Sequence, residues 1–170
     1  MSLVLQWDTE LRGKTRGLRH AIYHGTDRAA RATDLMGYAV VLTTYGVVRA
    51  ECPSRTMYGD QCPEGEGREG QRRKWRPRRR DLERRVGPLF QCEWERVILD
   101  EGHEIKNHAT HTNHACCTLQ ARYRWVLTGT PIQNRPQDYF SLLKFLRFKP
   151  YDEYRHWAQF LEKGVIGSGD

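Results

Sequence analysis

The sequence predicts an α/β protein in which a mostly parallel sheet is covered by helices on both of its faces. Short apolar segments of strand length alternate along the chain with segments that have the period of an amphipathic helix. Two of the apolar segments, residues 96–100 and 124–128, end abruptly in polar residues, as buried strands do at the edge of a sheet. With 170 residues, the chain is long enough for one domain with a packed core.

The first half is predicted to begin with a helix over residues 2–11. Ser2 can cap this helix, and Leu3, Trp7 and Leu11 form an apolar face at helical spacing. We expect this face, including Trp7, to lie in the core. The following segments predict strands at 19–24 and 38–43 and helices at 27–34 and 45–51.

The second half repeats the alternation. The pattern predicts strands at 96–100 and 124–128 and helices at 112–120, 135–146 and 152–162. In the helix over 135–146, residues spaced i, i+3, i+4 and i+7 form the expected buried face: Tyr139, Leu142, Leu143 and Leu146.

A segment rich in glycine, proline and charge separates the two halves. Residues 52–88 have no apolar period and are predicted to be a disordered basic insertion between a first part, 1–51, and a second part, 89–170. Residues 68–85 contain ten Lys and Arg against three acids, which equals the net charge of +7 of the whole chain. Three interpretations remain open for this cluster, which includes Arg78, Arg79 and Arg80: a solvated segment, a nuclear localisation signal, or a non-specific DNA tether.

Composition narrows the class of protein further. No apolar run approaches the roughly 18 residues of a membrane span, so we expect no membrane association. The five cysteines are odd in number and irregularly spaced, which favours reduced thiols in a cytosolic or nuclear protein. The histidines at 103, 108, 111 and 114 do not match the paired spacing of structural zinc sites, so we do not predict zinc there.

Two carboxylates follow the strand at 96–100. At the edge of a sheet, Asp100 could hold Mg²⁺ through water, and Glu101 could orient or deprotonate an attacking water, as nucleotide hydrolysis requires. Two solvated acids at a strand end are the simpler alternative.

The sequences of the segments at 96–103 and 125–134 resemble motifs II and III of helicase superfamily 2, and in particular those of the Snf2 group of DNA translocases. The resemblance rests on residues 96–103 (RVILDEGH, a DEAH-like box) and 125–134 (WVLTGTPIQN), and extends to 2–7, 23–25, 41–45 and 141–146. Residues 150–157 favour the branch that holds transcription termination factor 2 and lodestar. At Gly102 the family more often has alanine; we expect this difference to tune activity without abolishing it.

The resemblance implies an incomplete first RecA-like lobe of a motor that uses ATP and Mg²⁺. It assigns Asp100 to Mg²⁺ and the nucleotide, Glu101 to the hydrolytic water, and His103 to the link between the nucleotide and motif III. Thr128, Gly129 and Thr130 would couple the nucleotide state to DNA by hydrogen bonds to His103 or Glu101.

The implied partner is double-stranded DNA, bound through its backbone in a nuclear protein, since a translocase must be indifferent to sequence. Candidate DNA contacts outside the basic cluster are hydroxyls and amides near predicted helix starts and turns: Ser2, Thr43, Thr44, Gln133 and Asn134. Ordinary helix capping is the alternative for each of them.

The phosphate-binding loop with which the family's ATP site begins is not found in these 170 residues. Gly13-Lys14-Thr15 cannot belong to a phosphate-binding loop, because position 8 is Asp8 where that loop needs its first glycine. We therefore expect the 170 residues alone not to hydrolyse ATP. A non-catalytic nucleic-acid-binding protein with a degenerate motor lobe is the alternative class, and an intact phosphate loop elsewhere in the gene product would exclude it.

Overall fold

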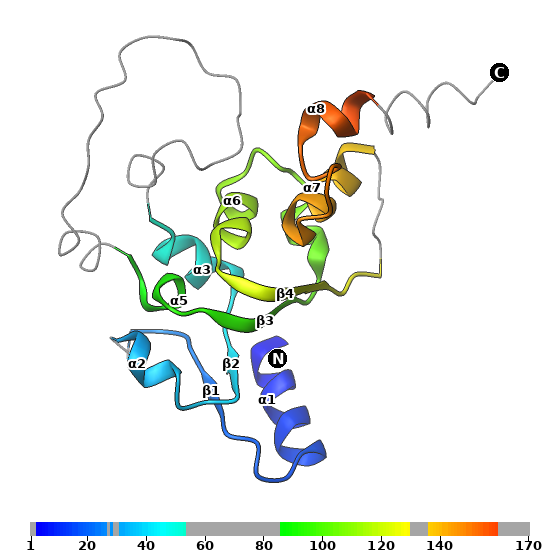
Figure 1. Ribbon diagram of the computed structural model, residues 1–170. Helices are drawn as coiled ribbons and strands as arrows, with labels where there is room; N and C mark the ends of the chain where they lie inside the picture. The colour runs from blue at the N-terminus through cyan, green and yellow to red at the C-terminus, as the bar shows by residue number, and fades with distance from the viewer. Residues whose placement is uncertain (1–2, 27, 29–30, 54–85, 130–135, 160–170) are drawn as a thin grey trace.

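A computed structural model of the chain describes residues 3–26, 28, 31–53, 86–129 and 136–159 (Figure 1). Two pairs of parallel strands form its sheets: β1 (His20–Ile22) with β2 (Val40–Leu42), and β3 (Trp94–Leu99) with β4 (Ala121–Val126). The predicted α/β fold with parallel strands is thereby confirmed. Within the described residues the two pairs are separate two-stranded sheets, where the sequence predicted one sheet.

Helices connect these strands in the predicted order. Their bounds are α1 (Leu3–Lys14), α2 (Ala32–Leu35), α3 (Tyr45–Glu51), α5 (Pro88–Gln91), the 3₁₀ helix η3 (Gly102–Ile105), α6 (His111–Thr118), α7 (Pro136–Leu146) and α8 (Tyr154–Trp157). Figure 1 shows α3, α6 and α7 above the β3–β4 pair, and α1 beside β1 and β2 below it. The short elements α5 and η3 were not predicted from the sequence.

The α1 helix begins and ends close to its predicted bounds, but its apolar face is not in the core. None of its described residues is buried, and Leu3 and Trp7 are 52% and 40% exposed. The expectation that Trp7 is a core residue is therefore wrong. The reason is that α1 packs mainly against β1 and β2, which are only three residues long each and offer little surface to cover a helix face.

The main core lies between α3, α5, α6, α7 and the inner face of β3. Its members come from many parts of the chain and include Tyr23, Leu35, Leu89, Phe90, Leu99, Ile105, Cys116, Leu142 and Phe145. A second, smaller cluster joins α7 to α8 through Phe140, Leu143 and Trp157.

The α7 helix contributes to both clusters, which changes its buried face. Leu142 and Phe145 enter the main core, while Phe140 and Leu143 enter the second cluster. The predicted members Tyr139 and Leu146 are instead exposed. A periodic pattern predicts one continuous stripe, and a helix packed between two clusters buries residues on both of its sides.

A half-buried arginine ties α6 to β4. Arg124 donates to the carbonyls of Cys116 and Leu119 at the end of α6, and its guanidinium lies over the ring of Phe145. Burial, followed by the charge of Arg147, lowers the pKa of Arg124 to about 10. The opposite face of the β3–β4 pair carries Ile98, Tyr123 and Trp125, which are exposed among the described residues.

The two ends of the basic insertion are held together by a buried glutamate. Glu51 accepts hydrogen bonds from the Tyr23 hydroxyl at 2.7 Å, from Arg28 at 2.8 Å and from the Leu89 backbone at 3.4 Å. Val86 is buried next to this group. Residues 54–85, which include the basic cluster, lie outside the described residues. The residues directly before and after this segment belong to the packed structure.

No helix among the described residues is both long enough and apolar enough to cross a membrane.

The turn after β3 packs tightly against β4 through Gly102. This glycine is buried, its N–H donates to the Leu127 carbonyl at 2.9 Å, and a Cβ atom built on it would overlap the Cγ1 methyl of Val126. Because valine has a stiff side chain, the methyl cannot rotate freely out of the way. The close approach of the two backbones therefore requires glycine as long as Val126 is present.

We expect Gly102→Ala to lower the free energy of unfolding by about 1–3 kcal/mol, the usual cost of overpacking. Val126→Ala removes the methyl that the new Cβ would meet, so Gly102→Ala should cost much less in that background. Urea denaturation of the two single variants and the double variant measures this coupling. Additive effects of the two substitutions would contradict the packing described here.

Candidate functional site

The two candidate carboxylates lie directly after β3. Asp100 follows the last residue of the strand, and its Oδ1 atom accepts a hydrogen bond from the backbone N–H of Glu101 at 3.0 Å. Glu101 has φ 52° and ψ 55°, a left-handed conformation that costs a non-glycine residue about 1–3 kcal/mol. Strained backbone of this kind clusters at functional sites, which supports a functional role for this turn.

His103 lies between two carboxylates. Its Nδ1 atom is 3.1 Å from Oε2 of Glu101, and its Nε2 atom is 3.7 Å from Oε1 of Glu104. Both His103 and Glu104 belong to η3, the short helix that starts with Gly102. The structure thus brings together Asp100, Glu101 and His103, the three residues that the sequence selected.

Two further residues contact Asp100, and sequence reasoning did not identify them as part of the site. The indole Nε1 of Trp7 donates to Oδ2 of Asp100 at 2.7 Å, and the Tyr45 hydroxyl donates to its backbone carbonyl at 2.8 Å. Burial, followed by the nearby Cys116 and acidic groups, raises the pKa of Tyr45, which keeps the phenol neutral and able to donate. These contacts span 93 and 55 residues of sequence, so no local spacing could indicate them.

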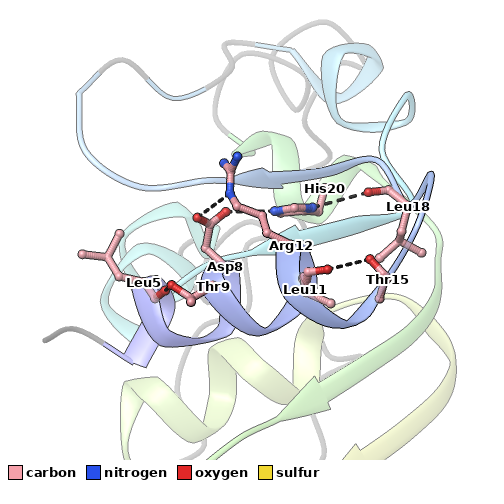
Figure 2. Close-up of polar contacts among 8 residues, drawn as sticks. All are labelled: Leu5, Asp8, Thr9, Leu11, Arg12, Thr15, Leu18 and His20. Atoms are coloured by element: carbon pink, nitrogen blue, oxygen red, sulfur yellow. Dashed lines mark hydrogen bonds and ion pairs between the residues drawn. The ribbon is translucent and has the colours of Figure 1, made fainter.

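Trp7 lies on α1, and the residue after it, Asp8, fixes this helix to β1. Figure 2 shows the Asp8 carboxylate between Arg12, on the following turn of α1, and His20 on β1, both at 2.8 Å. The hydrogen bonds from Arg12 and then His20 hold the pKa of Asp8 below its usual value. The Arg12 side chain is largely exposed, whereas His20 and Asp8 are mostly covered, so the contact to His20 is the one that places the helix.

The segment after β4 meets this turn through its backbone. The Leu127 N–H donates to the Leu99 carbonyl at 2.8 Å, and the Leu127 carbonyl accepts from Gly102. Thr128 and Gly129 follow directly, whereas Thr130 lies outside the described residues. The two motifs are therefore in direct contact through these backbone hydrogen bonds.

The proposed DNA-binding hydroxyls already have partners in the fold. Thr43 donates to the Tyr23 carbonyl at 2.9 Å, and Thr44 caps α3 by accepting from the Val47 N–H at 3.3 Å. Thr44 therefore has the capping role that was the alternative to a DNA contact. Ser2, Gln133, Asn134 and Arg78, Arg79 and Arg80 lie outside the described residues.

The donor set at the end of β3 fits one mode of metal binding. Among the described residues, no three His, Cys, Asp or Glu side chains gather closely enough to hold a metal by themselves. Mg²⁺ is usually bound by one or two carboxylates that share it with water and substrate phosphates, which does not need such a cluster. Asp100 and Glu101 fit that mode.

His108, one of the histidines considered for zinc, packs instead against the rings of Phe140 and Tyr154.

The sequence matches the model of the SNF2-related domain over residues 1–166. It is 32% identical over 168 residues to a *Drosophila melanogaster* protein named transcription termination factor 2, and covers 13% of that protein's length. It is 36% identical over 170 residues to an uncharacterised ATP-dependent helicase of *Schizosaccharomyces pombe*, of which it covers 15%. The DNA repair protein RAD5 of *Candida glabrata* is 36% identical over 167 residues, and 13% of it is covered.

The fold is also similar to a solved structure. The SWI2/SNF2 ATPase core of *Sulfolobus solfataricus* in complex with double-stranded DNA matches all of this chain with a TM-score of 0.66 and 26% identity, and the match covers 28% of that core. The parallel strands and surrounding helices are thus those of a RecA-like α/β fold. The chain spans about an eighth to a seventh of the length of these curated relatives. With a family model matched over nearly its whole length, the chain belongs to the SNF2-related domain family.

Proposed function

We propose that this chain is part of the first lobe of an ATP-dependent DNA translocase. The observation that supports the proposal most is the turn after β3, where Asp100, Glu101 and His103 lie together in contact with the segment after β4. Two solvated acids at a strand end would not explain the left-handed Glu101 or the close packing of Gly102.

In this proposal, Asp100 binds Mg²⁺ through water together with the phosphates of ATP. When bound there, the ion would supply positive charge to the transferred phosphoryl group. Glu101 orients and deprotonates the attacking water, and His103, 3.1 Å away, holds the Glu101 carboxylate in position. Thr128, Gly129 and Thr130 pass changes at the nucleotide on to the DNA-binding surface.

The proposed partner is double-stranded DNA, contacted mostly through its phosphates. Support comes from the *Sulfolobus* core, which was solved with double-stranded DNA, and from the names of the relatives, which include a transcription termination factor and DNA repair proteins. We place the function in the nucleus, in transcription termination, DNA repair or chromatin remodelling. Candidate contacts are Ser2, Thr43, Thr44, Gln133, Asn134 and the basic cluster with Arg78, Arg79 and Arg80.

The 170 residues by themselves should show no ATPase activity, with or without DNA. They contain no glycine-rich phosphate loop, and Gly13 and Lys14, the only pair that suggests one, lie in the last turn of α1. Backbone amides of that loop hold the phosphates, so their absence removes substrate binding. The measurement is phosphate release by the purified chain at saturating Mg²⁺ and ATP. DNA-stimulated turnover that Asp100→Asn abolishes would refute the expectation.

In the full-length protein, Glu101→Gln should reduce DNA-stimulated ATP hydrolysis by roughly 10²–10⁴-fold while nucleotide binding is largely kept. The amide preserves the size of the side chain and removes the group that accepts the proton from water. Glu104→Gln is the matched control, because Glu104 lies on the short helix that follows Glu101 and its carboxylate is farther from His103.

Turnover of the Glu101→Gln variant close to that of the wild type would exclude the proposed role of Glu101. A wild-type protein that binds DNA but never hydrolyses ATP would favour the alternative, a non-catalytic nucleic-acid-binding protein with a degenerate motor lobe.

Replacing Arg78, Arg79 and Arg80 together by alanine should weaken binding to an arbitrary DNA duplex and flatten its salt dependence. Each lost phosphate contact lowers the slope of log affinity against log salt by about 0.9. The measurement is affinity between low and moderate salt, with Arg122→Ala as a control at an exposed arginine that faces Glu95. Equal slopes for the triple variant and the wild type would show that these arginines do not contact DNA.

A further inference from the structure

We infer that Trp7 is a positioning residue for Asp100, and that its indole N–H sets how strongly this carboxylate holds a divalent cation. The inference rests on the proposed function, because it concerns the same Mg²⁺ site. It assigns a role to a residue of α1, a helix that contains none of the nucleotide-binding residues proposed above.

The geometry fixes the Asp100 carboxylate from two directions. Trp7 Nε1 donates to Oδ2 at 2.7 Å, and the Glu101 backbone N–H donates to Oδ1 at 3.0 Å. The Tyr45 hydroxyl fixes the main chain of the same residue at 2.8 Å. With one donor on each oxygen, the carboxylate cannot turn about its χ2 bond without breaking a hydrogen bond.

This arrangement leaves the carboxylate able to bind a metal-bound water. Each carboxylate oxygen can accept about two hydrogen bonds, and each receives one from the donors named here. The remaining lone pairs then point in fixed directions. Outer partners of this kind orient metal-binding carboxylates, and removing one typically costs 10–100-fold in metal affinity or activity.

Packing does not account for the position of Trp7. The residue is 40% exposed, and no described residue of α1 is buried. Instead, polar contacts hold the helix: the adjacent Asp8 is bound to His20 of β1 at 2.8 Å. The indole of Trp7 is partly exposed to water, yet it donates a hydrogen bond to Asp100, which lies 93 residues away in the sequence. A role in holding Asp100 explains this position better than packing in the core does.

The test is Trp7→Phe in the full-length protein, which keeps an aromatic ring and removes the donor. A second variant replaces Trp7 by benzothienylalanine, whose ring has nearly the shape of indole but carries sulfur in place of the N–H. This variant keeps the test decisive if the phenylalanine variant does not fold. Trp125→Phe, the same change at an exposed tryptophan on β4, is the matched control.

The primary readout is Mn²⁺ binding in the presence of ADP, followed by the loss of the signal of free Mn²⁺ in electron paramagnetic resonance. Both Trp7 variants should raise the Mn²⁺ dissociation constant by roughly 10–100-fold, and Trp125→Phe should leave it unchanged. The Mg²⁺ concentration for half-maximal ATP hydrolysis should rise in parallel, and saturating Mg²⁺ should restore the rate. A purely structural role would lower the rate without moving the metal dependence.

A wild-type protein that hydrolyses ATP, with Trp7 variants that bind Mn²⁺ as tightly as it does, would overturn this inference and leave the proposed function intact. A rate lost in the Trp7 variants and not recovered at high Mg²⁺ would overturn it as well. If the wild type neither hydrolyses ATP nor binds Mn²⁺ with ADP, the inference and the proposed function both fail.

Discussion

The backbone pairing between β3 and β4 continues past the ends of both strands, and the candidate site depends on it. Leu127 donates to Leu99 and accepts from Gly102, so the segment after β4 is bonded to residues on both sides of the two carboxylates. This pairing forces the chain to turn sharply between Leu99 and Gly102, and Glu101 adopts a left-handed conformation within that turn. The strain at Glu101 is held by hydrogen bonds that belong to the sheet. For the same reason, a displacement of either segment must move the other.

Around this turn, the partners of the two carboxylates come from the neighbouring His103 and from distant elements. Asp100 is held by α1 through Trp7 and by α3 through Tyr45, while the carboxylate of Glu101 contacts the neighbouring His103. The two acids therefore have different surroundings. Asp100 is fixed in orientation, which suits a metal-binding group, and the exposed Glu101 is close to a histidine, which suits a group that handles a proton.

The distribution of charge separates the packed part of the chain from the basic insertion. Outside residues 68–85, basic and acidic residues balance, whereas that segment contains the whole net charge. Glu51 binds groups on both sides of the insertion, Tyr23 and Arg28 before it and Leu89 after it. Because these hydrogen bonds close the junction, we expect changes in the length and charge of residues 54–85 to cost the core little.

The sequence alone determined the alternation of strands with longer helices and the parallel α/β class, and it predicted the candidate site at the end of β3. Alternating periods and strand ends are local signals, and α3 begins where predicted because Thr44 caps its first turn. The tertiary structure decided which residues surround the site. Trp7, expected in the core, contacts Asp100, and Tyr45 approaches it from another helix. It also decided that α7 buries Phe140 and Phe145 in place of Tyr139 and Leu146. These outcomes depend on contacts between segments far apart in the chain, and the period of a single segment contains no information about its partners.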